Sequence, residues 1–390
     1  MTTNQDKHVV LDKNNLKEIK AKDFNKDMKV VHQFIDMIKN PRKDSFLLSA
    51  HRGFRWDGVP ENSKSSIKRA VQNNMICVEI DIRLTSDGVP VLFHDPTLGR
   101  TTNIAEYLGR SDAYSPFTGK GYSPLISETP WKGCIENLKL KEEHGKICDE
   151  GVLDFTTMLD FIEKEKLDIV LSMDIKCKEA TPILLDIMKD RKNAAGVPAL
   201  EWCVWKVFVH MYGHPAELEA ETWWQEATRI GNPVYIPVYE PWPTRQVKDP
   251  LKSIKEFSHH PNVIALEIGL RAPGGLMQDL FDYATSSDCP IKSIGFFAAL
   301  GDLWRYDNKP IKFDLGDFKE NIPWELDDQF SHHYFKIEHP PQLHDSLLLE
   351  GDSPNGHDYR ADLALYKKLG FTWTITDRCE ELRAKGLITQ

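Results

Sequence analysis

Short apolar segments rich in β-branched and aromatic residues alternate along this chain with amphipathic segments that have the period of an α-helix. This alternation is typical of strand–helix units, which build a parallel sheet with helices outside it. The expected strands are 46–50, 76–82, 89–93, 167–175, 203–210, 234–239, 263–268, 291–297 and 371–375. Helices are expected at 63–73, 156–165 and 359–369. The pattern predicts an α/β fold, a TIM (β/α)8 barrel, and because nine strands exceed eight, we expect one of the later strands to be accessory.

The chain has 390 residues, which is enough for one barrel with insertions, since a TIM barrel takes about 250 residues. We expect residues 1–45 to form an N-terminal extension with a helix packed on the barrel, and residues 46–390 to form the barrel itself. Segments 101–150 and 302–350 lack a regular period and are expected to be inserted loops or caps. Whether the second insertion is a lid or a surface segment stays open.

Charge and composition exclude several classes of protein. The net charge is −10, with 59 acidic and 49 basic residues, which argues against a broad basic surface for nucleic acid. An anionic small-molecule substrate would need a local cationic pocket. The sequence shows neither the pattern of a signal peptide nor an apolar run of about 18 residues, so we expect a cytoplasmic protein without a transmembrane segment. Seven scattered cysteines predict reduced thiols, and the oligomeric state stays open.

Polar residues gather where the first expected strands end. His51 and Arg52 follow strand 46–50, and His94 and Asp95 follow strand 89–93. Because the carboxyl ends of parallel barrel strands meet at one mouth, we expect both imidazoles there. A single histidine at a strand end is more often structural than catalytic, but the combination with nearby acids favours a catalytic site.

Two carboxylates lie within the apolar strand 76–82. Glu79 and Asp81 are two residues apart, so their side chains point to the same face of the strand. Burying both without a cation would be strongly unfavourable, because two unpaired negative charges would leave water together. A divalent metal ion would remove this repulsion, and oxygen ligands suit Mg²⁺ or Ca²⁺.

Four separated motifs occur in a fixed order, "AHRG", "PENS", "VEIDIRLTSDGVPVLFHDPTLGRTT" and "LSMDIK". Together they resemble the signature of the glycerophosphodiester phosphodiesterase family, a TIM-barrel group related to phosphatidylinositol-specific phospholipases and the spider-venom phospholipase D toxins. The match is close over the first strands of the barrel, and it returns at "LSMDIK" and "FTWTITD". The resemblance implies a phosphodiesterase with a divalent metal cofactor.

The resemblance also implies roles for individual residues. His51 and His94 match the two histidines that act as general acid and base, and we provisionally take His51 as the base and His94 as the acid, with the reverse left open. Arg52 matches the arginine that binds phosphate, and Lys176 matches a lysine near the phosphate.

Three acids match the family's metal site, with one departure from the pattern. Glu79 and Asp81 match two acidic ligands of Mg²⁺ or Ca²⁺. Asp174 stands where family members usually have glutamate. A carboxylate shorter by one methylene could ligate the ion directly or through water, so the geometry of the metal site stays open.

Three further residues are expected at the substrate pocket. Glu61 is expected to fix the loop after Gly53 by hydrogen bonds to backbone or to a catalytic neighbour. Lys206 lies in an apolar strand, and it either faces the mouth or extends outward to solvent. Trp373 either lines the mouth as an apolar wall for the alcohol group or packs in the core.

The sequence thus predicts a metal-dependent phosphodiesterase that hydrolyses glycerophosphodiesters to glycerol 3-phosphate and an alcohol. One alternative is lyase-like release of a cyclic phosphate from a lysophospholipid, because the attacking group could be water or a hydroxyl of the substrate. Others are a barrel that acts on another phosphorylated small molecule, or a catalytically silent phosphate-binding barrel. The presence of both imidazoles argues against the silent barrel, because binding alone needs no acid/base pair.

Overall fold

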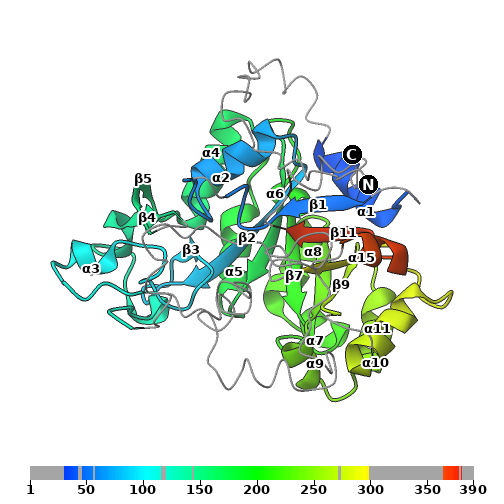
Figure 1. Cartoon of the computed structure of the whole chain (residues 1–390). Helices are drawn as coiled ribbons and strands as arrows, with labels where there is room; N and C mark the ends of the chain where they lie inside the picture. Colours follow the sequence, from blue (N-terminus) through cyan, green and yellow to red (C-terminus); the bar gives the residue numbers. More distant parts are fainter. Residues whose placement is uncertain are drawn as a thin grey trace, which may run out of the picture.

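A closed parallel barrel forms the centre of the protein (Figure 1). The computed structural model describes residues 30–42, 46–55, 58–115, 120–142, 145–270, 274–297, 363–376 and 379. Within this part, eight parallel strands pair in the order β1, β2, β6, β7, β8, β9, β10, β11, and β11 pairs with β1. Their bounds are Leu47–Ala50, Cys77–Leu84, Val170–Ile175, Cys203–Phe208, Tyr235–Tyr239, Leu266–Ile268, Ile294–Phe297 and Trp373–Thr376. The predicted TIM barrel is confirmed.

One of the nine predicted strands, 89–93, lies outside the barrel. It contains β3 (Pro90–Leu92), which pairs antiparallel with β2. We expected one of the later strands to be accessory, and that expectation was wrong. The tight turn at Asp87 and Gly88, where Gly88 has a φ of 76°, returns the chain antiparallel, because a parallel connection needs a dozen or more residues.

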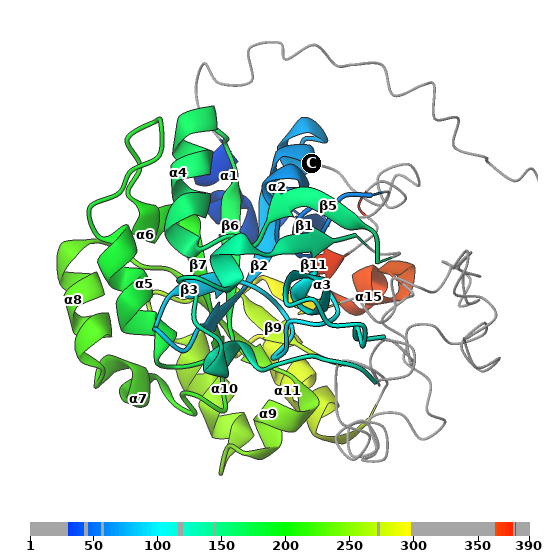
Figure 2. The same cartoon turned by 90° about the vertical axis from the view of Figure 1, so that its left-hand side faces the viewer.

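Helices surround the barrel (Figure 2). The main ones are α2 (Lys64–Gln72), α4 (Phe155–Glu165), α5 (Ala180–Met188), α8 (Thr222–Ile230), α10 (Pro250–Ser258), α11 (Gly275–Thr285) and α15 (Leu363–Leu369), with short helices α6 (Ala199–Trp202), α7 (Pro215–Glu219) and α9 (Pro241–Arg245). The predicted helices 63–73 and 156–165 are confirmed. In the third, 359–369, residues 359–362 lie outside the described residues. No helix in the described ranges is long and apolar enough to cross a membrane.

The side chain of the residue just before the helix fixes where two of these helices begin. Ser63 caps α2 through a capping box, in which its hydroxyl accepts from the Ser66 amide and the Ser66 hydroxyl accepts from the Ser63 amide. The Asp154 carboxylate caps α4 by accepting from the Thr157 amide at 2.9 Å. The start of α2 matters for the site, because it sets the path of the loop that contains Glu61.

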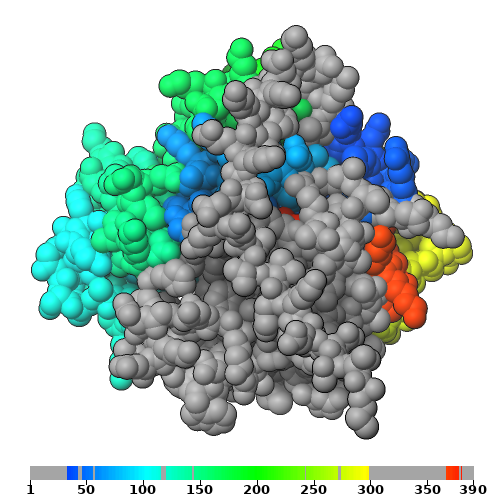
Figure 3. Space-filling view, turned by 45° about the horizontal axis from the view of Figure 1, so that its top comes forward, coloured from blue at the N-terminus to red at the C-terminus, as the bar shows by residue number. Residues whose placement is uncertain are grey.

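The first predicted insertion, 101–150, folds over a small apolar core that it shares with β3 and with residues on either side of the insertion. It contains α3 (Ile104–Tyr107), the 3₁₀ turns η1 (Ile126–Glu128) and η2 (Ile135–Asn137), and the unpredicted hairpin of β4 (Lys139–Lys141) and β5 (Ile147–Gly151). This unit forms the cyan and blue-green side of the molecule in Figure 3. Its core residues are Val91, Phe93, Leu98, Ile104, Ile126, Ile135, Leu138, Leu140 and Val152. The second predicted insertion, 302–350, lies outside the described residues.

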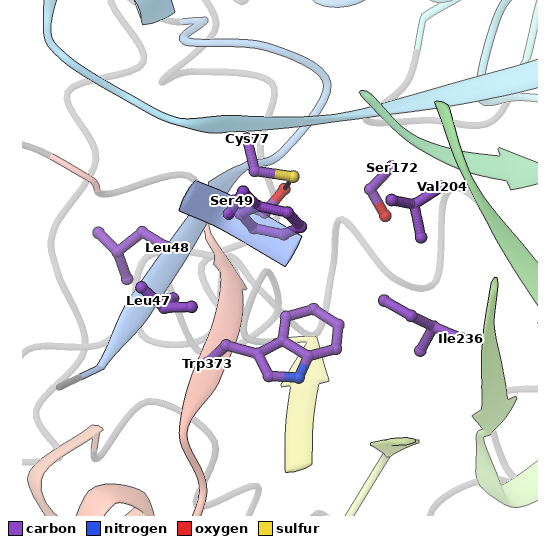
Figure 4. A pocket seen from close by; sticks show the side chains of 9 residues that line it. Leu47, Leu48, Ser49, Cys77, Ser172, Val204, Ile236 and Trp373 are labelled. Atoms are coloured by element: carbon purple, nitrogen blue, oxygen red, sulfur yellow. Dashed lines mark hydrogen bonds between the residues drawn. The ribbon is translucent and has the colours of Figure 1, made fainter. Parts of the chain in front are cut away.

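Helix α1 (Val30–Lys39) packs at the amino-terminal end of the barrel. Its buried residues Phe34 and Ile38 belong to the main core. Phe34 lines a small apolar cavity inside that end with Leu47, Cys77 and Trp373 (Figure 4). Packing at this end contributes stability, since TIM-barrel chemistry lies at the opposite, carboxyl-terminal face.

We therefore predict that Phe34→Ala lowers the free energy of unfolding by about 3 kcal/mol, because it removes a buried aromatic ring and leaves a cavity. The loss would be measured by urea denaturation. Gln33→Ala, at an exposed position of the same helix, is the control and should change stability by less than about 0.5 kcal/mol. Equal effects of the two substitutions would contradict the packing role of Phe34.

Candidate active site

The chain turns sharply where β1 ends, and this turn places two predicted site residues. Arg52 has a φ of 54° and Gly53 a φ of 84°, both in the left-handed region. A Cβ on Gly53 would collide with the Ser66 side chain, so glycine is required there. The turn directs the Arg52 amide to Glu79 Oε2 at 3.0 Å.

The three predicted metal ligands converge inside the barrel. Glu79 and Asp81 lie on β2, and Asp174 lies on β6 directly beside Asp81 in register. All three are buried, and they can offer carboxylate oxygens that lie within 4.8 Å of one another. Burial and the neighbouring Asp81 raise the pKa of Glu79 well above its ordinary value. Hard oxygen donors that repel one another in this way fit a divalent cation such as Mg²⁺ or Ca²⁺.

Sequence reasoning missed Asn62, which orients one of these ligands. Asn62 has a φ of 52°, and its side chain donates from Nδ2 to Asp81 Oδ2 at 3.0 Å and accepts from the Asp81 amide at 3.2 Å. Asparagine is one of the few residues that tolerate a left-handed backbone. The Pro-Glu-Asn segment could have indicated a functional role for Asn62, but only the geometry of the turn shows that its side chain reaches β2.

The two predicted phosphate-binding residues lie against the same acids. Lys176 Nζ is 2.9 Å from Asp81 Oδ1 and 3.0 Å from Asp174 Oδ1. Arg52 Nε is 3.4 Å from Asp81 Oδ2. Burial would raise the pKa of Asp81, but Lys176 and other nearby cations outweigh it and hold that pKa below its ordinary value. Both cations therefore border the predicted metal site.

Glu61 is the centre of a cluster of three arginines. Its carboxylate accepts from Arg52 Nη1 at 3.1 Å, from Arg55 Nη1 at 2.6 Å and from Arg100 Nη2 at 2.8 Å. Burial opposes ionisation, but Arg100, Arg52 and Arg55 together lower the pKa of Glu61. Glu61 therefore orients Arg52, and its expected place in the substrate pocket stays a prediction.

The arginine cluster extends to both predicted catalytic histidines. Arg100 Nε donates to Asp95 Oδ2 at 2.6 Å, and Asp95 Oδ1 lies 2.9 Å from His94 Nδ1. At the other end, Arg55 Nη2 lies 3.5 Å from His51 Nδ1. Sequence reasoning assigned no role to Arg55 or Arg100. The partners of Arg55 are near in the chain but depend on how the loop after β1 folds, and Arg100 reaches Glu61 from 39 residues away.

The antiparallel strand β3 delivers His94 to this position. Phe93 donates its amide to the Asp81 carbonyl at 3.0 Å, and the His94 carbonyl accepts from Arg83 Nε at 2.6 Å. His94 is held beside the acids of β2, although its strand runs opposite to those of the barrel. Burial, followed by the charge of Arg52, lowers the pKa of His94 well below its ordinary value.

The structure decides between the alternatives left open for two predicted pocket residues. Trp373 is the first residue of β11, in register with Leu47 at the amino-terminal end of the barrel, so its placement at the mouth was wrong and core packing is what the structure has. Lys206 is buried inside the barrel, where Nζ is 3.4 Å from Asp174 Oδ2 and 3.2 Å from Glu267 Oε1. Of the two alternatives for Lys206, the outward-facing one is therefore wrong, and contact with substrate stays a prediction.

Comparison with known proteins agrees with the motifs. The model of the glycerophosphoryl diester phosphodiesterase family matches residues 51–267, more than half of the chain. Glycerophosphodiester phosphodiesterase 1 of Rattus norvegicus is 49% identical over 61 residues, which cover 16% of this chain and 18% of that protein. A glycerophosphodiester phosphodiesterase of Bacillus altitudinis is 37% identical over 90 residues, or 20% of this chain and 36% of that one. The matched segment thus spans only a minor part of these relatives.

A solved structure supports the fold. The crystal structure of a glycerophosphoryl diester phosphodiesterase from Parabacteroides distasonis superposes with a TM-score of 0.52 at 17% identity, covering 92% of this chain and 93% of that one. At this identity the likeness concerns the barrel fold alone.

We predict that Glu61→Gln destabilises the protein by about 3 kcal/mol at neutral pH, because it leaves three buried guanidinium groups without their shared anion. Since the pKa of Glu61 is lowered in the folded state, its contribution is present above the ordinary glutamate pKa of 4.5 and is lost as the pH falls below that value. Thermal unfolding of the wild type and of the Glu61→Gln variant, at pH values above and below 4.5, measures this contribution.

The control for this prediction is Glu165→Gln, which removes an exposed carboxylate paired with Lys68 at 3.1 Å. We expect it to change stability by less than about 1 kcal/mol. If Glu61→Gln were equally mild, or if its effect grew at acidic pH, the central role of Glu61 would be contradicted.

Proposed function

Because the chain belongs to the glycerophosphoryl diester phosphodiesterase family, we propose that it hydrolyses a small glycerophosphodiester to glycerol 3-phosphate and an alcohol. The observation that carries the proposal is the cluster of Glu79, Asp81 and Asp174 inside the barrel. Both predicted catalytic histidines are tied to the arginine network beside this cluster.

The proposed cofactor is Mg²⁺ or Ca²⁺, held by Glu79, Asp81 and Asp174. A divalent ion at this position would supply a Lewis acid that stabilises negative charge on the phosphoryl oxygens. The protein's own contribution is to present three ionisable carboxylates on two adjacent strands, with the Asn62 side chain fixing the orientation of Asp81.

Arg52 and Lys176 are the proposed phosphate-binding residues. A phosphodiester carries a negative charge that repels an attacking oxygen, and cations fixed in a buried site offset that repulsion at little reorganisation cost. Glu61 holds the Arg52 guanidinium in a defined orientation. Lys176 is held between two carboxylates, which raise its pKa so that it remains charged.

The hydrogen bonds favour a division of acid and base roles that is opposite to the provisional one. Asp95 is paired with Arg100, so its carboxylate accepts from His94 Nδ1, which leaves Nε2 of the neutral ring with a lone pair. The lowered pKa keeps His94 neutral, as a general base must be. Arg55 can only donate, so Nδ1 of the neutral His51 ring accepts from it and Nε2 carries the hydrogen, which leaves Nε2 no lone pair for the role of base. As the acid, His51 would give the Nε2 proton from its imidazolium form and return to the neutral ring. We therefore propose His94 as the base and His51 as the acid.

The proposed reaction predicts that purified protein releases glycerol 3-phosphate from glycerophosphocholine or glycerophosphoethanolamine with Mg²⁺ or Ca²⁺, and that EDTA abolishes the release. Phosphorus NMR of the products identifies the nucleophile, since a cyclic phosphate would mean attack by a hydroxyl of the substrate. Asp81→Asn should lower kcat at least about 100-fold, because it removes a charged ligand. Release that is unaffected by EDTA would contradict the metal requirement.

The proposed acid and base roles predict that the kcat losses of the two histidine variants depend differently on whether the leaving group needs a proton. Alanine at His51 or His94 should each lower kcat on glycerophosphocholine by about 10² to 10⁴. With a glycerol phosphodiester whose leaving group is p-nitrophenolate, which needs no proton, the loss for His51→Ala should shrink and the loss for His94→Ala should persist. The reverse pattern would restore the provisional division.

His214→Ala is the matched control for both histidine variants. This imidazole is partly exposed and pairs with Glu256 at 2.7 Å. Its replacement should leave kcat on both substrates within about twofold, because it contacts none of the groups assigned to the reaction.

A further inference from the structure

Lys206 and Glu267 form an ion pair inside the barrel that the proposed chemistry does not use. They lie on β7 and β9, and the Lys206 Nζ to Glu267 Oε1 distance is 3.2 Å. The side chains are 3% and 1% exposed. Both members of an ion pair this deep lose their hydration, which costs free energy of folding. Its presence in two apolar strands therefore needs another favourable interaction or a functional reason.

The pair is coupled to the carboxylate cluster through Asp174. Lys206 Nζ is 3.4 Å from Asp174 Oδ2, while Lys176 Nζ is 3.0 Å from Asp174 Oδ1. Both oxygens of Asp174 thus contact an ammonium group, and any cation bound to Asp174 would lie within a few ångströms of Lys206. Glu79 also interacts electrostatically with Lys206, and Glu240 with Glu267.

We propose that the Lys206–Glu267 pair sets the affinity of the carboxylate cluster for its divalent cation, with Lys206 weakening the binding and Glu267 strengthening it. The inference rests on the proposed function only in that it assumes a cation at Glu79, Asp81 and Asp174. It assigns to Lys206 and Glu267 a role in metal affinity and none in the proton transfers.

Electrostatics gives the two effects opposite signs. Lys206 stabilises Asp174 when no ion is present, and it repels an incoming cation with a force that a buried, weakly polar environment screens poorly. Glu267 pairs with the same Lys206 ammonium group. Its negative charge partly cancels the positive charge of Lys206 that a cation at Asp174 would experience. The balance is important at Asp174, because a second ammonium group, Lys176 Nζ, already lies 3.0 Å from its Oδ1.

The test is isothermal titration calorimetry of the full chain with Mg²⁺ and with Ca²⁺, at mildly alkaline pH where the Glu267 carboxyl is ionised. Lys206→Met should tighten binding by about tenfold or more, because it removes one positive charge close to the ion. Glu267→Gln should weaken binding by a similar factor. A purely structural role would instead weaken binding in both variants.

Two controls separate charge from packing. Lys206→Arg keeps the charge and should bind the ion within about threefold of the wild type. Lys178→Met removes a surface charge that pairs with Glu221, and it should leave the affinity unchanged.

The double variant Lys206→Met/Glu267→Gln keeps the net charge, so its affinity should return towards the wild-type value. It also keeps the inference testable if Lys206→Met alone does not fold. Thermal unfolding without metal should show a lower Tm for Lys206→Met than for wild type, with a larger rise on adding the ion, because the ion then replaces the missing cation.

Weaker or unchanged binding by Lys206→Met, or effects of the same sign in Lys206→Met and Glu267→Gln, would overturn the inference. Wild-type protein that binds neither ion would overturn it together with the proposed cofactor. Opposite effects on ion binding without any release of glycerol 3-phosphate would support this inference and overturn the proposed reaction, so the two failures are distinguishable.

Discussion

The burial of carboxylates inside the barrel is the constraint on which the rest of this site depends. Glu79, Asp81, Asp174 and Glu267 are all nearly inaccessible to water, and unpaired charges in such a place would oppose folding strongly. Ammonium and guanidinium groups from other strands therefore lie beside them, with Lys206 between two of the acids. The same ion pairs that offset the cost of burial keep together three carboxylates that could hold a metal ion, so stability and the proposed function share one set of side chains.

A second network outside the strands connects the two histidines. Three arginines meet at Glu61, and from there hydrogen bonds extend through Asp95 to His94 and through Arg55 to His51. Such a network favours one tautomer on each imidazole, because a guanidinium only donates and a carboxylate only accepts. It depends on the short antiparallel strand β3, since a parallel crossover from β2 would have required a helix and would have carried His94 far from the loop of Glu61.

The two ends of the barrel have different physical roles. At the amino-terminal end, Phe34 of α1 and Trp373 of β11 pack with apolar side chains around a small cavity. At the carboxyl-terminal end, the residues after β1 and around β2 and β6 bring charged groups together. Apolar packing at the amino-terminal end offsets the free energy that burial of charged groups at the mouth costs. TIM barrels in general divide stability and chemistry between their two ends in this way.

The sequence by itself determined the strands of the barrel, the α/β class and which polar residues lie on or follow those strands, because strand periodicity and strand ends are local properties. Glu79 and Asp81 share a face whatever surrounds them, and His51 follows a strand in any barrel. Only the tertiary structure decided that strand 89–93 runs antiparallel, that Lys206 faces inward, that Trp373 lies far from the mouth, and that Arg55 and Arg100 meet at Glu61. The strands of a parallel barrel are apolar on both faces, so their pattern does not say which face is inside. Residues that lie dozens of positions apart in the chain come into contact only when the barrel closes, and no local sequence pattern encodes that contact.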